Sequence, residues 1–178
     1  MRNLILIICI LFFYTSCTKT RELNDYEVNF MPYKSGEELV FVNTSNEKVD
    51  TIFIKKIERY IPDGPMVYFN ETIAAIDKND RQIVRVSAGY GKYSESYLSI
   101  KGLDGRHSLK EISEKPVIEF ETQNLSFDDV VIIEAKNKQS DTNKVIKVHW
   151  SKSKGIVQYV DVENGTWQIL NQQSSERN

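Results

Sequence analysis

The sequence predicts an all-β protein built as a single antiparallel meander of about nine or ten strands. Along many short segments, apolar and β-branched residues alternate with polar ones, a pattern typical of strands with one buried and one solvated face. Turn residues separate these segments, and helical periodicity is scarce. Because a meander of this length must limit its exposed edges, we expect it to curl as a barrel, a half-barrel or a sandwich with at most one short helix.

Ten segments fit the strand pattern. In chain order they are residues 38–43, 50–59, 66–76, 82–88, 95–101, 116–122, 130–136, 144–150, 156–162 and 166–170. Alternation is clear at Val84, Val86 and Ala88, which share one face of their strand. The stretch 71–76 fits a helical turn as well as a strand.

Two local signals fix connections in this scheme. The pair Asn164-Gly165 predicts a two-residue type I′ turn between the last two strands, because both residues tolerate a positive φ. A short helix is expected at residues 109–114, since Ser108 and Glu111 have the spacing of a capping box and a proline follows the run.

An apolar run from Leu4 to Tyr14 precedes the predicted domain, with Arg2 before it and Thr15-Ser16-Cys17 after it. The run has eleven residues, whereas a membrane-spanning helix needs roughly 20. We therefore expect residues 1–16 to be a signal peptide that is removed from the mature protein.

Residues 14–17 resemble the lipobox of bacterial lipoproteins. The resemblance implies that the thiol of Cys17 receives a diacylglycerol and that the leader is cut before this residue, so that acyl chains on Cys17 hold the protein on a membrane. The alternative is an ordinary secretory leader with Cys17 as an unpaired thiol. The other cysteine, Cys9, lies inside the leader, so the mature chain has no disulfide partner for Cys17.

The expected organisation is one domain between two polar segments. Residues 17–29 are polar and mixed in charge, as expected for a lipidated tether. Residues 30–170 form the single β domain, and residues 171–178, which contain no apolar side chain, are expected to be a flexible tail.

Two stretches of the domain, residues 33–41 and 149–159, resemble small envelope lipoproteins, many of them from Bacteroidota. The second stretch has an aromatic strand end, a short loop, Gly-Ile-Val and another aromatic residue. Some similar proteins have the open β-barrel of lipoprotein carriers, whose concave face can hold acyl chains. The resemblance implies a cell-envelope location and, by analogy, an apolar or amphiphilic ligand.

The residues after the cysteine indicate which membrane face is occupied. Thr18 is not the aspartate that retains some lipoproteins at an inner membrane. Lys19 and Arg21 are basic, whereas the Bacteroidota surface-export signal is an acidic cluster. We expect a protein of the outer membrane that faces the periplasm.

Several classes of function are disfavoured. The net charge of −2 and the lack of a basic run argue against nucleic acid as a partner. The two histidines, His107 and His149, lack metal-ligand spacing, and no cofactor motif is present. Asp104, His107 and Ser108 have the side-chain types of a hydrolase triad, but a turn and a helix cap explain them better. We therefore expect a protein with no catalytic residues, no metal site and no cofactor.

Aromatic residues are the candidate ligand-binding groups. Tyr90 and Tyr93 lie in a glycine-rich connection, and Trp150 and Trp167 lie on strands or strand ends. Exposed aromatic rings can line a groove or stack on a ligand at low entropic cost. The alternative is that the glycines form a tight turn and that the aromatic side chains pack across strands.

These observations favour a lipid-anchored, non-catalytic binding module for an apolar or amphiphilic ligand. The alternative is an accessory or structural subunit that docks on another envelope protein. The first function requires an apolar concave face, and the second requires an exposed apolar patch.

Overall fold

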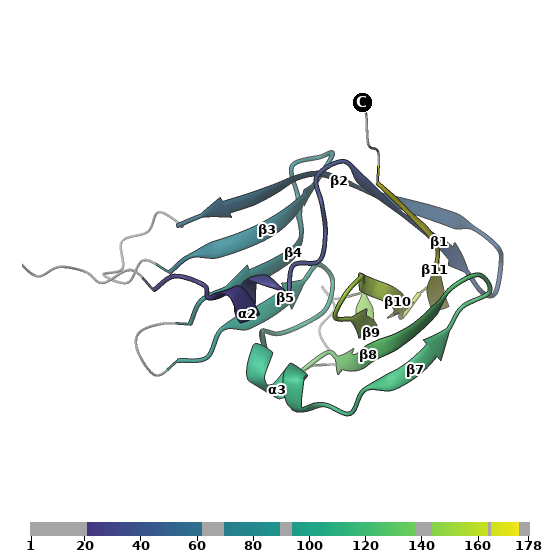
Figure 1. Cartoon of the computed structure of the whole chain (residues 1–178). Coiled ribbons are helices and arrows are strands. Elements are labelled where there is room, and N and C mark those ends of the chain that lie inside the picture. Colours follow the sequence, from purple (N-terminus) through teal and green to yellow (C-terminus); the bar gives the residue numbers. More distant parts are fainter. Residues whose placement is uncertain (1–20, 62–69, 90–93, 138–143, 164, 175–178) are drawn as a thin grey trace, which may run out of the picture.

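The computed structural model describes residues 21–61, 70–89, 94–137, 144–163 and 165–174. Eleven antiparallel strands form one curled sheet, a half-barrel, accompanied by two short helices, α2 and α3 (Figure 1). The structure thus confirms the all-β class, and the half-barrel is the shape adopted among the three that were predicted.

Each predicted strand is present, with small shifts at its ends, and β6 is an additional strand of two residues. The strands are β1 (Glu37–Asn43), β2 (Val49–Tyr60), β3 (Thr72–Asp77), β4 (Gln82–Ser87), β5 (Tyr97–Ile100), β6 (His107–Ser108), β7 (Ile118–Glu121), β8 (Ser126–Glu134), β9 (Val145–Ser151), β10 (Gly155–Asp161) and β11 (Gly165–Ser174). The ambiguous stretch 71–76 falls largely in β3, which pairs with β2 on one side and β4 on the other and is buried along its whole length. The part of the predicted third strand at 66–69 lies outside the described residues.

The strand order is β6-β5-β4-β3-β2-β1-β11-β10-β9-β8-β7. The chain starts in the middle of the sheet at β1, runs to one edge at β6, and returns from the other edge at β7 to β11 beside β1. The sheet is therefore a meander whose first and last strands, β1 and β11, pair with each other, and its two edges are β6 and β7. Helix α3 (Leu109–Glu114) lies on the connection between the two edges (Figure 1). The short connection is possible because the sheet curls.

The predicted helix is confirmed at its expected residues. The Ser108 side chain accepts a hydrogen bond from the backbone N–H of Glu111 at 3.3 Å. This bond satisfies one of the N–H groups that the first helical turn leaves without a partner. Leu109 and Ile112 bury the helix against the rest of the domain.

The hairpin between β10 and β11 forms, but its turn is longer than predicted. Asp161 pairs with Gly165, so three residues separate the paired positions instead of two. The Asp161 carboxylate accepts a hydrogen bond from the backbone N–H of Glu163 at 2.7 Å, so the turn begins earlier in the chain. Gly165 has the expected positive φ, +86°, and Asn164 lies outside the described residues.

The folded part of the chain extends beyond both predicted boundaries. Helix α2 (Asp25–Val28) lies in the segment assigned to the tether, and a full capping box between Asn24 and Glu27 stabilises its start. At the other end, β11 continues to Ser174 and pairs with β1 within the segment assigned to the tail.

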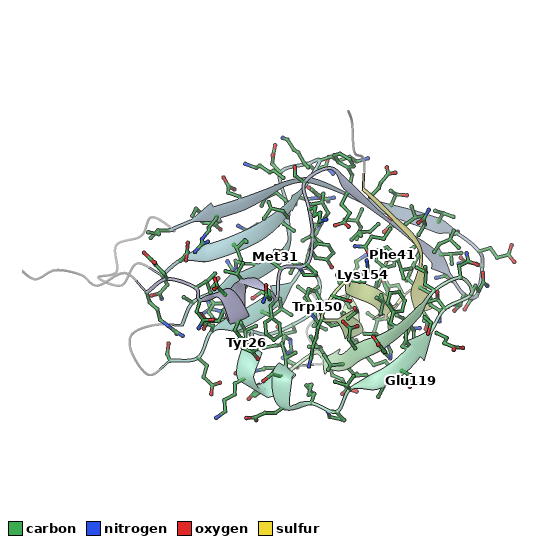
Figure 2. The ribbon with its side chains drawn as sticks, in the orientation of Figure 1. Tyr26, Met31, Phe41, Glu119, Trp150 and Lys154 are labelled. Atoms are coloured by element: carbon green, nitrogen blue, oxygen red, sulfur yellow. The ribbon has the colours of Figure 1, made fainter. Side chains whose placement is uncertain are left out.

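The concave face of the sheet carries the core. Phe41 and Trp150 lie inside the curl with Met31 of the N-terminal segment, whereas Glu119 of β7 lies outside (Figure 2). Phe41 meets Tyr159 in an edge-to-face contact with ring centroids 5.2 Å apart. The largest side chains that are almost fully buried are Leu39, Phe41, Ile54, Leu98, Ile112, Ile133, Trp150 and Ile169.

The two ends of the half-barrel differ. At one end, which we call the closed end, the N-terminal strap (residues 21–33) crosses the sheet. It buries Leu23, Phe30, Met31 and Tyr33, and the carbonyl oxygen of Arg21 accepts a hydrogen bond from the backbone N–H of Glu71 at 2.9 Å. The opposite end, the open end, contains the β3–β4 turn and the start of β2 and β9. None of the described helices is long and apolar enough to cross a membrane.

Candidate functional site

The open end of the half-barrel contains a pocket of about 500 Å³. This volume lies within the range of roughly 300 to 1,000 Å³ that is usual for small-ligand sites. Its walls come from strands that are far apart in the sequence but meet at this end, and they include Ile52, Ile83, Ile100, Val145, Val148 and Ile156. The concave face therefore offers an apolar cavity with charged residues around it.

Tyr159 joins the apolar wall to the charged rim. It lies opposite Val148 on the neighbouring strand, and its ring stacks on Trp167 with centroids 5.9 Å apart. Its hydroxyl group donates a long hydrogen bond of 3.4 Å to the carboxylate of Asp50. Burial raises the pKa of Tyr159, and the negative charge of Asp50 raises it further. The phenol therefore stays neutral and remains a hydrogen-bond donor at physiological pH.

The β3–β4 turn supplies a rigid part of the rim. The Asp77 carboxylate accepts hydrogen bonds from the backbone N–H groups of Asn79 and Arg81, each at 2.9 Å, and from Arg81 Nε at 2.8 Å. Burial alone would raise the pKa of Asp77, but these bonds together lower it. The negative charge of Asp77 is thus engaged within its own turn.

Four basic residues line the pocket, and two of them are paired. Arg81 forms an ion pair with Asp77 at 2.8 Å, and Lys144 forms one with Glu163 at 3.0 Å. The other two, Lys78 and Lys101, are exposed and form no ion pair with any residue that the structure describes.

The predicted aromatic candidates do not converge on this pocket. Trp150 is fully buried between the strap and the sheet, with its ring edge-on to Tyr33 at 6.1 Å, and has no surface with which to stack on a ligand. Trp167 is half-buried and contributes indirectly by supporting Tyr159. Tyr90 and Tyr93, like the predicted lipid-attachment residue Cys17, lie outside the described residues.

Sequence reasoning missed the residues that do form the pocket. Isoleucines and valines of the wall follow the same alternation as the residues of the core, so the pattern gives no sign of an unfilled cavity. The one available signal was the position of Lys78 and Lys101, each at the point where a strand ends.

The residues with hydrolase side-chain types do not form a triad. The His107 ring contacts the backbone oxygen of Asp104 at 3.2 Å, and the Ser108 hydroxyl donates to Glu95 rather than to His107. His149 stacks on Phe120 at 4.8 Å, and burial lowers its pKa. Within the described ranges, no group of three or more histidine, cysteine or acidic residues could hold a metal ion.

Comparison with protein-family models, with curated proteins and with solved structures finds no match.

Proposed function

We propose that the protein is a lipid-anchored envelope protein that binds an apolar or amphiphilic ligand in the pocket at the open end. The observation that carries the proposal is the cavity of about 500 Å³, which has apolar walls and a charged mouth. An apolar part of a ligand gains about 25 cal/mol for each Å² that it buries, and a polar part could stay at the mouth in contact with water.

The position of the core supports a site that opens at one end. Tyr33, Phe41 and Trp150 are buried in the core and do not line the pocket. A ligand would enter from the open end. Because the pocket lies beyond the packed core, the fold does not require it to be filled by the protein's own side chains.

A bulky substitution in the pocket wall tests the binding site. The complete mature chain with Cys17→Ser, which carries no acyl group, would be titrated with a neutral naphthylamine dye that fluoresces in apolar surroundings. Ile52 is half-buried in the pocket wall, so Ile52→Trp should fill the cavity and weaken dye binding by about tenfold or more.

Val49→Trp is the matched control, because Val49 lies three residues away on the same strand and is 60% exposed. This control should bind the dye as the parent chain does. Equal affinity for all three proteins would show that the dye binds elsewhere and would contradict the proposal.

The proposed anchor is the lipidated Cys17, on the outer membrane facing the periplasm. Its support is the apolar run followed by Thr15-Ser16-Cys17. Radiolabelled fatty acid should enter the wild-type protein and be absent from Cys17→Ala, because the thioether needs the thiol. Equal labelling of both proteins would exclude this anchor, and digestion by protease added to intact cells would exclude the periplasmic orientation.

A further inference from the structure

We infer that the ligand is an anionic amphiphile, whose apolar tail occupies the pocket and whose acidic head group is bound by Lys78 and Lys101. The inference rests on the proposed function and specifies the chemical class of its ligand. It is carried by the charges around the mouth of the pocket and by the partners that these charges have.

Both lysines start from backbone that is fixed at the pocket mouth. Lys101 follows β5 directly, and its backbone N–H donates to the carbonyl oxygen of Ile83, a residue of the pocket wall, at 2.8 Å. Lys78 follows Asp77 in the hydrogen-bonded β3–β4 turn. Two exposed lysines on hydrogen-bonded backbone therefore belong to the lining of the same apolar cavity.

The acidic groups nearest to Lys78 are engaged by other partners. Asp77 binds Arg81 through its side chain, and Asp80 forms an ion pair with Lys55 at 2.8 Å. Hydrogen bonding and the positive charge of Lys55 lower the pKa of Asp80. Across the mouth, Asp50 accepts the hydrogen bond from Tyr159. Asp161, which also lines the pocket, accepts a hydrogen bond from the backbone N–H of Glu163 at 2.7 Å. Asp50 and Asp161 keep their negative charges, so Lys78 and Lys101 are distinguished by forming no ion pair with a described residue and by having ammonium donors free for a ligand.

This arrangement matches a negative head group attached to an apolar tail. A lysine ammonium is a compact charge with three donors and suits both carboxylate and phosphate oxygens. Beside an apolar cavity, part of the surrounding water is excluded, so attraction between opposite charges is stronger than it is between fully solvated groups. A cationic head group would be repelled by the two ammonium groups, and the carboxylates of the lining that could attract it, Asp50 and Asp161, already accept hydrogen bonds.

Competition between amphiphiles with one common tail tests the inference. Dodecanoate, dodecyl phosphate, dodecyltrimethylammonium and a nonionic dodecyl maltoside would each displace the neutral dye from the complete mature chain with Cys17→Ser, below their micelle concentrations. At least one of the two anions should bind about tenfold more tightly than the cation and more tightly than the nonionic compound. The anion that binds more tightly shows whether the head group that the pocket prefers is a carboxylate or a phosphate.

The double variant Lys78→Gln with Lys101→Gln should remove this preference, lowering affinity for the anions by about fivefold to tenfold while nonionic binding stays constant. Lys110→Gln is the control, because Lys110 is an exposed lysine on α3, away from the pocket. Its affinities should equal those of the parent chain.

The outcomes separate the two proposals. If the dye and every amphiphile fail to bind the parent chain, the proposed function itself is wrong. If the dye binds but anions and cations compete equally, or if the double variant keeps the preference for anions, the pocket remains and the assignment of its head group to these lysines is overturned.

Discussion

The closed and open ends of the half-barrel both gather charged side chains, but they place them in different surroundings. At the closed end, Glu27 and Glu71 are buried and paired with arginines. At the open end, Lys78 and Lys101 are exposed and have no acidic partner among the described residues.

The partners of the buried carboxylates explain the difference. Glu71 accepts hydrogen bonds from Arg59 and from the backbone N–H of Leu23, so it ties the strap to β3. Glu27 pairs with Arg21 at 3.0 Å and also completes the capping box of α2. A buried charge is tolerated when it is paired and hydrogen-bonded, and here it holds the strap in place. Unpaired charge beside an apolar cavity is available for a ligand instead.

The largest effect on stability is expected from Gly155→Ala at the closed end. Gly155 has φ +83°, and an added Cβ would lie 2.2 Å from the Tyr33 hydroxyl oxygen. That hydroxyl accepts a hydrogen bond from the backbone N–H of Ile156 at 2.8 Å, so the ring cannot move away without losing the bond. Backbone strain and the steric clash together should cost about 2 to 5 kcal/mol, measured by urea unfolding.

Gly165→Ala is the control for backbone strain alone. Gly165 has a similar φ of +86°, but its added Cβ would meet only the Ser45 side chain at 3.8 Å, an ordinary contact. We expect a loss of about 1 kcal/mol. Equal losses at the two glycines would show that the Tyr33 contact does not matter.

A smaller effect is expected from Glu71→Gln, which removes the charge that faces Arg59. The loss should be about 1 to 2 kcal/mol at neutral pH. The hydrogen bond from Arg59 lowers the pKa of Glu71 despite its burial, so the carboxylate stabilises the fold above the unfolded-state pKa of roughly 4.3. This contribution is lost as the pH falls through the lower pKa of the folded state.

The difference in unfolding free energy between wild type and Glu71→Gln should therefore stay constant from pH 7 to about pH 5 and shrink below about pH 4. Glu119→Gln, on the outside of β7, is the matched control and should change stability by less than about 0.5 kcal/mol at any of these pH values. A pH-independent difference for Glu71→Gln would contradict the proposed ion pair.

The smallest effect on stability is expected at the open end. Replacing both Lys78 and Lys101 by glutamine should change the free energy of unfolding by less than about 0.5 kcal/mol, because neither side chain is buried. A clear destabilisation in urea would mean that these lysines hold the fold as the closed-end charges do. The contrast between the two ends would then disappear.

Much of the fold could be predicted because alternation and turn residues are local signals. The strand segments and the helix at Leu109–Glu114 follow from them. Helix α2 also had a local signal, the capping-box spacing of Asn24 and Glu27, but the polar composition around it favoured a tether. The extension of β11 to Ser174 had no such signal, since its polar residues are ordered by pairing with β1.

The pocket could not be predicted from the sequence. Its walls depend on how far the sheet curls and on where the aromatic core stops, and both are properties of the whole fold. Trp150 illustrates this limit, because the same residue on a strand end could face a ligand or fill the core, and the strap that crosses it decides the outcome.

The strap also determines how the proposed anchor would orient the molecule. Arg21 contacts the sheet beside Glu71, and Glu71 is paired with Arg59 of β2. Arg59 lies nine residues along this strand from Asp50 at the pocket mouth, which is a distance of about 30 Å in an extended strand. Three residues separate Cys17 from Arg21, so the four residue steps between them span at most about 14 Å. The bilayer would then lie nearest the closed end, with the pocket directed away from it. Such a protein would exchange its ligand with a passing carrier or another membrane, rather than withdraw it from the bilayer beneath it.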